Sequence, residues 1–289
     1  MELRSKKISK EENYNYDKDP NDLTETKRSG KFSAFPKVLP VKPEEGIESK
    51  PLHPNLPKPP TCLLMVSPVK TGKSTIISNL LLNDNFYGQD YFDEVNIISN
   101  TIANDSTSRF LQKAFNTHDQ YEDSIIDSIV GKQKAIKDKK EQPSMALILD
   151  DCLGSIRREG KVNHLASRFR HYNIQLLLIS SQNFRAVSPI IRQNATAVIV
   201  GSPFPNSKEL GKLAEEYGDL FGGQESWLKM YKHATPNRYD FLFMDLGENP
   251  PVAYHNFENQ VAVGDKMLFN PKGIDIGLES GDTDIEDIL

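Results

Sequence analysis

Residues 61–75 read Thr-Cys-Leu-Leu-Met-Val-Ser-Pro-Val-Lys-Thr-Gly-Lys-Ser-Thr, and this stretch decides the fold. The apolar run 62–66 has the length of one buried strand. The run stops at a Ser-Pro pair, and Gly-Lys-Ser at 72–74 then opens a segment whose apolar residues recur with helical spacing. A strand, a short loop and Gly-Lys-Ser at a helix start are the context of a phosphate-binding loop. In such a loop, backbone N–H groups and the positive end of the helix dipole hold polyphosphate.

The loop departs from the usual pattern Gly-x4-Gly-Lys-Ser/Thr at its first glycine, which is Ser67 here. Serine followed by proline can also turn the chain out of a strand, with a more restricted backbone. The alternative interpretation is an ordinary strand–turn–helix with a surface lysine, but the strand before and the amphipathic helix after favour the phosphate loop. We expect Lys73 to reach the β- and γ-phosphates and Ser74 to ligate Mg²⁺. The residues expected to bind nucleotide are Ser67, Pro68, Val69, Lys70, Thr71, Gly72, Lys73, Ser74 and Thr75.

Composition limits the class of protein. The chain has 289 residues, of which 37% are hydrophobic, so we expect part of it to lie outside the packed core. A net charge of −5 excludes a uniformly basic nucleic-acid binder, and any DNA contact must come from a local patch. Cys62 and Cys152 both adjoin apolar strands, which favours free thiols in a reducing compartment over a disulfide. The sequence has neither a signal-peptide core nor a membrane-spanning apolar run, so we expect a soluble, intracellular protein without membrane contact.

We divide the chain into three parts. Residues 1–60 are expected to form a disordered tail and a linker rich in proline, with a docking strap for a neighbouring subunit as the alternative. Residues 61–258 form the predicted P-loop domain. Residues 259–289 form an extension with an acidic tail, because 273–289 hold six acidic residues and no basic one. We expect 1 to about 50 and 273–289 to be unstructured in the isolated protein.

The predicted domain alternates strands and helices. Near-continuous apolar strands separated by helices indicate an α/β fold, with a mostly parallel central sheet flanked by helices. The predicted strands are 62–66, 94–99, 145–149, 174–179 and 197–200. The predicted helices follow the first strand to about residue 82 and then cover 105–117, 121–141, 155–172, 189–193, 207–221 and 224–234. Residues 239–245 and 252–257, separated by Gly-Glu-Asn-Pro-Pro, predict a C-terminal β-hairpin.

Acidic side chains follow the predicted strand 145–149, which reads Met-Ala-Leu-Ile-Leu before Asp150 and Asp151. This is the form of a Walker B strand, whose terminal aspartate holds the Mg²⁺ shell. Asp150 is the candidate for that role, and Asp151 for orienting the attacking water. Related ATPases usually have a glutamate at the second position, and aspartate is one methylene shorter. A solvated turn is the alternative interpretation of the pair.

The predicted strand 174–179 ends in Ser-Ser-Gln-Asn, so that Gln182 follows its tip. In P-loop proteins with an added strand, this tip lies between the phosphate loop and the Walker B strand. A polar side chain there can contact the γ-phosphate or its water. Gln182 is therefore a candidate sensor, with a surface cap as the alternative.

Basic residues crowd the predicted helix 155–172: Arg157, Arg158, Lys161, Arg168, Arg170 and His171. Positive charges at the end of a helix suit its dipole, which is the simplest interpretation of Arg168 and Arg170. The alternative is an arginine finger that reaches the nucleotide of a neighbouring subunit, a role that requires an oligomer.

Four motifs occur in one order: Ser-Pro-Val-Lys-Thr-Gly-Lys-Ser from 67, Leu-Ile-Leu-Asp-Asp from 147, Arg-Phe-Arg-His from 168 ahead of Leu-Leu-Leu-Ile-Ser-Ser-Gln, and Ile-Ile-Arg-Gln-Asn from 190. This order resembles the genome-packaging ATPases of large DNA viruses, the poxvirus-type branch of the FtsK–HerA superfamily. The resemblance covers about 61–257 and departs from the family at Ser67 and Asp151.

The resemblance implies a ring-shaped homo-oligomeric motor that hydrolyses ATP, with Mg²⁺, to drive double-stranded DNA into a capsid. By this resemblance, Lys73 and Ser74 would bind the nucleotide, and Asp150 would bind Mg²⁺. Asp151 would activate the attacking water. Gln182 would act as the sensor of the γ-phosphate, and Arg170 as the arginine finger. Its partners would be DNA and capsid or portal-vertex proteins, at the assembly site in the host cytoplasm and in the virion. A P-loop kinase of small molecules and a non-catalytic, nucleotide-dependent scaffold are the competing classes.

Overall fold

The computed structural model describes residues 52–103, 108–156, 160–204 and 207–261. The two predicted tails, at 1–50 and 273–289, lie outside these residues, as do Arg157 and Arg158.

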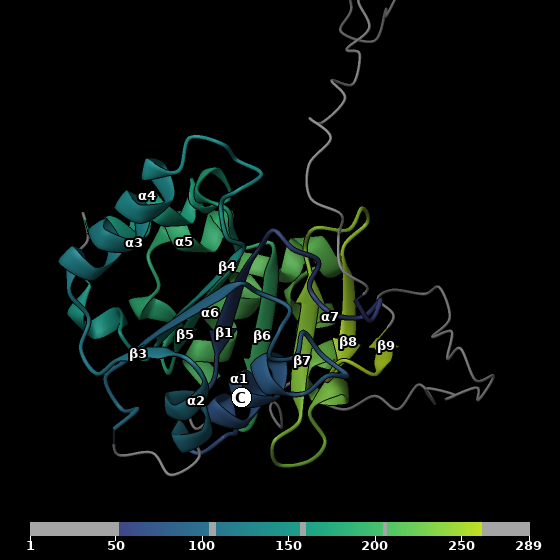
Figure 1. Ribbon diagram of the computed structural model, residues 1–289. Helices are drawn as coiled ribbons and strands as arrows, with labels where there is room; N and C mark the ends of the chain where they lie inside the picture. The colour runs from purple at the N-terminus through teal and green to yellow at the C-terminus, as the bar shows by residue number, and fades with distance from the viewer. Residues whose placement is uncertain (1–51, 104–107, 157–159, 205–206, 262–289) are drawn as a thin grey trace, which may run out of the picture. The chain divides into compact units, whose positions relative to one another are not determined.

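The described residues contain a nine-stranded sheet with the order β3-β2-β4-β5-β1-β6-β7-β8-β9 (Figure 1). Strands β1 to β6 run parallel, and β7, β8 and β9 continue the sheet as antiparallel strands, which confirms the predicted sheet and C-terminal hairpin. The strands are β1 (Thr61–Val66), β2 (Glu94–Ser99), β3 (Asn116–His118), β4 (Met145–Asp150), β5 (Ile174–Ser181), β6 (Ala197–Gly201), β7 (Phe241–Asp245), β8 (Val252–His255) and β9 (Asn259–Val261).

Helices cover both faces of the sheet, as the apolar runs predict. Leu63 and Met65 of β1 pack on the face covered by α1 (Lys73–Leu82) and α2 (Arg109–Ala114). Leu64 and Val66 pack on the opposite face. That face is covered by α3 (Asp123–Ala135), α4 (Lys161–Ala166), α5 (Pro189–Asn194), α6 (Ser207–Tyr217) and α7 (Gln224–Ala234). Burial of each aliphatic side chain contributes about 1.5–3 kcal/mol relative to exposure, so a strand buried on both faces holds the site rigidly.

Strand β5 lies between β1 and β4 and pairs with both. Its register sets Ser181 beside Val66 of β1 and Ser180 beside Asp150 of β4. The carboxyl ends of these three strands therefore meet at one edge of the sheet, and this confirms the predicted added strand.

The prediction of one helix over 155–172 is wrong. Helix α4 ends at Ala166, and a separate 3₁₀ turn covers Phe169–Tyr172 before the left-handed Asn173. The Ser167 hydroxyl donates to the His164 carbonyl at 3.0 Å, a local bond that competes with helix continuation. Arg168 and Arg170 are therefore not at the end of a long basic helix.

Two other helices are shorter than predicted. Helix α3 ends at Ala135 rather than near 141, because the Asp138 carboxylate accepts from the Lys140 N–H at 2.9 Å and forms a turn. Helix α2 ends at Ala114 rather than near 117, because 116–118 pair with β2 as the edge strand β3. The residues that follow the C-terminal ends of α2 and α3 are largely charged or polar, so the sequence has no apolar pattern that marks where these helices end.

Residues on either side of the predicted domain also contact it. Leu56, assigned above to the linker, is 1% exposed in the core beneath α1. The Tyr87 hydroxyl donates to the Pro57 carbonyl, and the Asn55 amide donates to the Phe257 carbonyl at 2.9 Å. Strand β9 extends the sheet past residue 258. Residues 55–57 of the proline-rich segment are thus packed against the domain.

Both cysteines are buried free thiols, as predicted. Burial raises the pKa of Cys62 and of Cys152 to about 12. Within the described part of the chain, every helix is too short or too polar to cross a membrane.

Candidate nucleotide-binding site

The phosphate loop joins β1 to α1 through residues 67–72. Lys70 and Gly72 have left-handed backbones, with φ of 59° and 94°. Gly72 is the N-cap of α1, so the cap residue has no side chain to satisfy the N–H groups of the first turn. These groups and the helix dipole favour a bound anion. Ser74 and Thr75 lie in this first turn.

Ser67 is accommodated in the glycine position by bonds within the loop and by a glycine opposite. Its hydroxyl is hydrogen-bonded to that of Thr71, which in turn donates to the Pro68 carbonyl at 2.7 Å. A Cβ added to Gly201, at the end of β6, would lie only 2.0 Å from the Ser67 Oγ. The Ser67 side chain, which a glycine would lack, therefore occupies the space left by the missing side chain of Gly201 on β6.

We expect Gly201→Ala to destabilise the fold by about 1–3 kcal/mol, because the new methyl overlaps the Ser67 hydroxyl. The double variant Ser67→Gly with Gly201→Ala should recover part of that loss, which denaturant unfolding of both singles and the double would measure as a coupling energy. Strict additivity of the two changes would contradict this packing relation.

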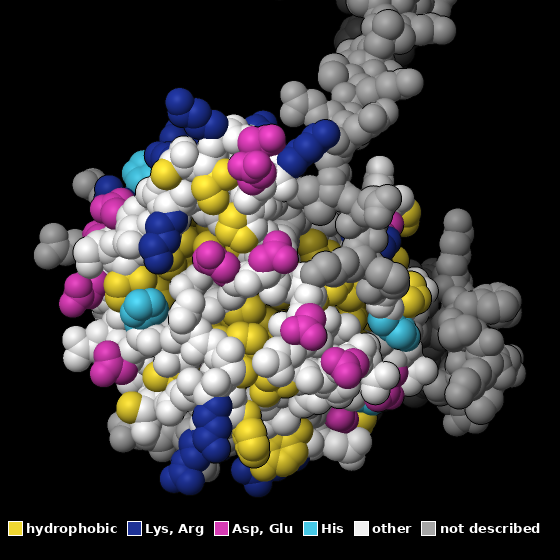
Figure 2. Space-filling model, viewed as in Figure 1, with side chains coloured by type: hydrophobic (Ala, Val, Ile, Leu, Met, Phe, Trp, Pro, Cys, Tyr) yellow, Lys and Arg dark blue, Asp and Glu magenta, His cyan; other side chains and the backbone are white. Residues whose placement is uncertain are grey.

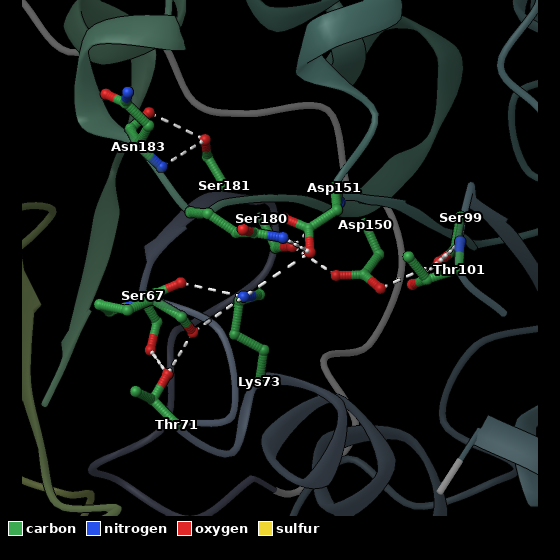
Figure 3. A network of polar contacts seen from close by, with 12 residues as sticks. Ser67, Thr71, Lys73, Ser99, Thr101, Asp150, Asp151, Ser180, Ser181 and Asn183 are labelled. Atoms are coloured by element: carbon green, nitrogen blue, oxygen red, sulfur yellow. Dashed lines mark hydrogen bonds and ion pairs between the residues drawn. The ribbon is translucent and has the colours of Figure 1, made fainter. Parts of the chain in front are cut away.

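Lys73 lies inside the loop, with a side chain that is 8% exposed. Its Nζ donates to the carbonyls of Ser67 at 2.9 Å and Pro68 at 3.1 Å, and lies 3.6 Å from Asp151 Oδ2 (Figure 3). The ammonium group is therefore held over the loop and directed toward the acidic end of β4.

Asp150 ends β4 as a buried carboxylate. Its Oδ2 accepts from the Ser99 hydroxyl at 3.0 Å, and its Oδ1 accepts from the Ser180 hydroxyl (Figure 3). The pKa of Asp150 is raised, first by burial and also by the neighbouring Asp151, and the hydrogen bonds from Ser180 and Ser99 and the charge of Lys73 offset part of this rise. The sequence interpretation missed Ser99 and Ser180; both are the register partners of Asp150 on the neighbouring strands.

Asp151 and Gln182 complete the cluster. Asp151 has a left-handed backbone with φ of 50°, and its N–H donates to the Ser180 Oγ at 3.3 Å. Gln182 follows β5, and its Nε2 donates to Asp151 Oδ2 at 2.9 Å. The same carboxylate oxygen thus contacts both Lys73 and Gln182.

Of the residues predicted to do chemistry, Lys73, Asp150, Asp151 and Gln182 meet at this edge of the sheet, but Arg170 does not. Arg170 is exposed and precedes β5, whose eight residues span about 26 Å. Its guanidinium lies 6.0 Å from the centre of the Phe169 ring. Arg170 is therefore at the far end of the strand from Gln182.

The oxygen donors here suit Mg²⁺. The described residues include no cluster of three or more His, Cys, Asp or Glu that could enclose a metal ion. Mg²⁺ in phosphate-transfer sites needs only one or two protein carboxylates, because substrate phosphates and water supply the other ligands. The buried Asp150 carboxylate, fixed by two serines, and the Ser74 hydroxyl on α1 fit this limited requirement.

Three features together define a P-loop NTPase fold. A Gly-Lys-Ser loop joins the buried strand β1 to helix α1, strand β4 ends in aspartate, and the added strand β5 lies between β1 and β4.

No protein-family model matches the chain. The uncharacterized protein 075L of Invertebrate iridescent virus 6 is 25% identical over 186 residues, which cover 63% of this chain and 69% of that protein. The DNA-packaging ATPase B204 of Sulfolobus turreted icosahedral virus is similar in structure, with a TM-score of 0.49, 18% identity, and coverage of 68% of this chain and 98% of that one. The genome-packaging NTPase B204 of Sulfolobus turreted icosahedral virus 2, in complex with AMPPCP, is also similar in structure. Its TM-score is 0.46 at 19% identity, and the match covers 67% of this chain and 96% of that one.

Proposed function

We propose that this chain is an ATP-hydrolysing motor that moves double-stranded DNA into a viral capsid. The observation that carries the ATPase part is the meeting of Lys73, Asp151 and Gln182 beside the N-terminus of α1. The DNA-packaging part rests on the order of the sequence motifs, which resembles that of packaging ATPases.

In the proposed reaction, the loop N–H groups and Lys73 bind the phosphates of ATP, and Lys73 exchanges the Ser67 and Pro68 carbonyls for phosphate oxygens. Ser74 and Asp150 would hold Mg²⁺, which neutralises phosphate charge when bound. Asp151 orients a water whose oxygen attacks the γ-phosphorus. The bond from that phosphorus to the β,γ-bridging oxygen breaks, ADP leaves, and the water proton passes to Asp151 or to the phosphate.

Asp151 suits the water-orienting role despite its short side chain. Its left-handed backbone turns the carboxylate back over the site, where it contacts Lys73 and Gln182. Gln182 is then positioned to sense the γ-phosphate through the same carboxylate.

DNA contact in this proposal is local. On the face shown in Figure 2, acidic side chains are interspersed across the middle, and basic ones lie mainly toward the edges of the view. A motor that grips phosphates transiently needs a few such basic groups around a ring rather than a basic surface. We propose a homo-oligomeric ring with capsid or portal-vertex partners, acting at the assembly site in the host cytoplasm and in the virion.

The test is the rate of ATP hydrolysis with and without duplex DNA, alongside transfer of phosphate to nucleosides and nucleotides. Stimulation by duplex DNA supports the motor. Phosphorylation of a small molecule would favour a kinase, and the absence of turnover with intact ATP binding would favour a scaffold.

Asp150→Asn and Asp151→Asn should differ in kind. The first should weaken Mg²⁺-dependent nucleotide binding, because the amide removes the charge that the serines hold in place. The second should keep binding and slow hydrolysis by about 10²–10⁴-fold, as loss of a general base does. Calorimetric titration with Mg-AMPPCP and steady-state turnover separate the two effects. Equal loss of binding in both variants would remove Asp151 from the water-orienting role.

A further inference from the structure

The order of the strands gives the bound nucleotide a direction, if the proposed function is correct. Asp151 and Gln182 lie on the β4 and β5 side of the phosphate loop, where the γ-phosphate must be. On the other side of β1 are β6 and then β7. The α-phosphate, the sugar and the base must therefore extend toward β7.

An apolar pocket lies on that side, between α1 and the β7–β8 hairpin. Its volume is about 160 Å³, below the roughly 300–1,000 Å³ of a pocket that encloses a drug-sized ligand, so it suits a single ring system. Phe257 packs edge-on against Phe86 and Phe241, with ring centres 5.8 and 5.1 Å apart. The lining residues are Thr75, Ile76, Asn79, Phe86, Phe241, Asn256, Phe257 and Glu258.

The phosphate loop and the pocket are connected twice. Thr75 follows the loop on α1 and lines the pocket. Tyr239 lies beside the loop, since its Cδ1 is 3.5 Å from the position that a Cβ on Gly72 would take, and Phe241 two residues later lines the pocket. A ligand whose phosphates occupy the loop would meet this segment next.

Tyr239 has the exposure and the backbone of a binding residue rather than a core residue. It is a large aromatic side chain that is 55% exposed, on a left-handed backbone with φ of 77° that bulky residues rarely adopt. The Arg238 guanidinium lies 5.0 Å from the ring centre, a cation–π contact that orients the ring. The packing of the core does not require this ring.

We propose that Tyr239 and the apolar pocket beside α1 bind the purine base of the nucleotide. The base stacks on the Tyr239 ring, and its apolar faces enter the space lined by Phe241 and Phe257. Thr75 supplies a polar group at the lining of the pocket, whereas the amides of Asn79 and Asn256 are already hydrogen-bonded within the chain. This inference rests on the proposed function and adds to it the residues that recognise the base.

The experiment compares binding of Mg-AMPPCP with binding of Mg-tripolyphosphate, which has phosphates but no base, by calorimetry on the full chain. Tyr239→Ala should bind the nucleotide about tenfold more weakly, the amount that loss of one stacked aromatic ring predicts. Asn79→Phe, which fills the pocket from α1, should do the same. Neither change should alter tripolyphosphate affinity.

Two variants serve as controls. Tyr239→Phe keeps the ring and should bind nucleotide as the unmodified chain does. Phe110→Ala removes a ring that is 67% exposed on α2, away from the pocket, and should have no effect.

Unchanged nucleotide affinity in both Tyr239→Ala and Asn79→Phe would overturn the base pocket while leaving the phosphate loop in place. Equal weakening of nucleotide and tripolyphosphate would also overturn it, because the variants would then act by distorting the loop. If the unmodified chain binds neither ligand, the proposed function itself fails.

Discussion

Replacing Lys73 with alanine should abolish ATP hydrolysis and leave the chain folded. The ammonium group is the positive charge held nearest the loop carbonyls and Asp151, and in the proposed reaction it stabilises charge on the phosphates. Removing one such donor lowers turnover by about 10²–10³-fold, and loss of nucleotide affinity adds to this. Phosphate release and calorimetric binding of Mg-AMPPCP measure both effects.

The fold should survive because Lys73 bonds to loop carbonyls and not to the apolar core. Thermal unfolding should remain cooperative. Lys229→Ala is a suitable control, because this lysine is 72% exposed on α7 and pairs only with Glu225 one turn earlier among the contacts described. Near-normal hydrolysis by Lys73→Ala would eliminate the phosphate-loop interpretation.

Arg170→Ala should lose hydrolysis while keeping nucleotide affinity, if Arg170 completes the site of a neighbouring subunit. Within its own chain, Arg170 is separated from Gln182 by the length of β5. An arginine finger supplied by a neighbour accelerates phosphoryl transfer by about 10³–10⁵-fold, so the loss of turnover should be at least as large as the roughly 10²–10³-fold expected for Lys73→Ala. Turnover and AMPPCP binding, measured on the same preparation, test this.

Mixing Arg170→Ala with Lys73→Ala should restore some activity. A mixed ring contains interfaces with an intact loop on one side and an intact arginine on the other. Arg168→Ala is the matched comparison, since Arg168 is also exposed and lies two residues earlier. Normal turnover of Arg170→Ala alone would return Arg170 to the role of a surface charge and make Arg168 the next candidate.

The buried strands could be predicted because their apolar runs are long and end abruptly. Strands β1, β4 and β5 are buried along nearly their whole length, and only a parallel sheet covered on both faces explains this. The short edge strands β3 and β9 carry polar residues such as Asn116 and Asn259, and their backbone pairing has no apolar signal in the sequence.

The meeting of Lys73, Asp150 and Gln182 at one edge of the sheet could also be predicted, because each lies at or after a recognisable strand end. Ser99 and Ser180 could not, because their role depends on the register of three strands that are far apart in sequence. Tyr239 was equally hidden. Its closeness to Gly72 comes from the antiparallel return of β7 beside β6, which no local pattern reveals.

The two buried thiols make the molecule convenient for site-specific labelling. Cys62 and Cys152 are the only cysteines in the sequence, both are enclosed by the core, and each has a pKa of about 12. Because the thiolate is the form that reacts with maleimides, neither should take up dye at neutral pH while the domain is folded. A single cysteine introduced on the surface could therefore carry a fluorophore in an otherwise unaltered chain, so that energy transfer between labelled copies can test whether the proposed ring forms.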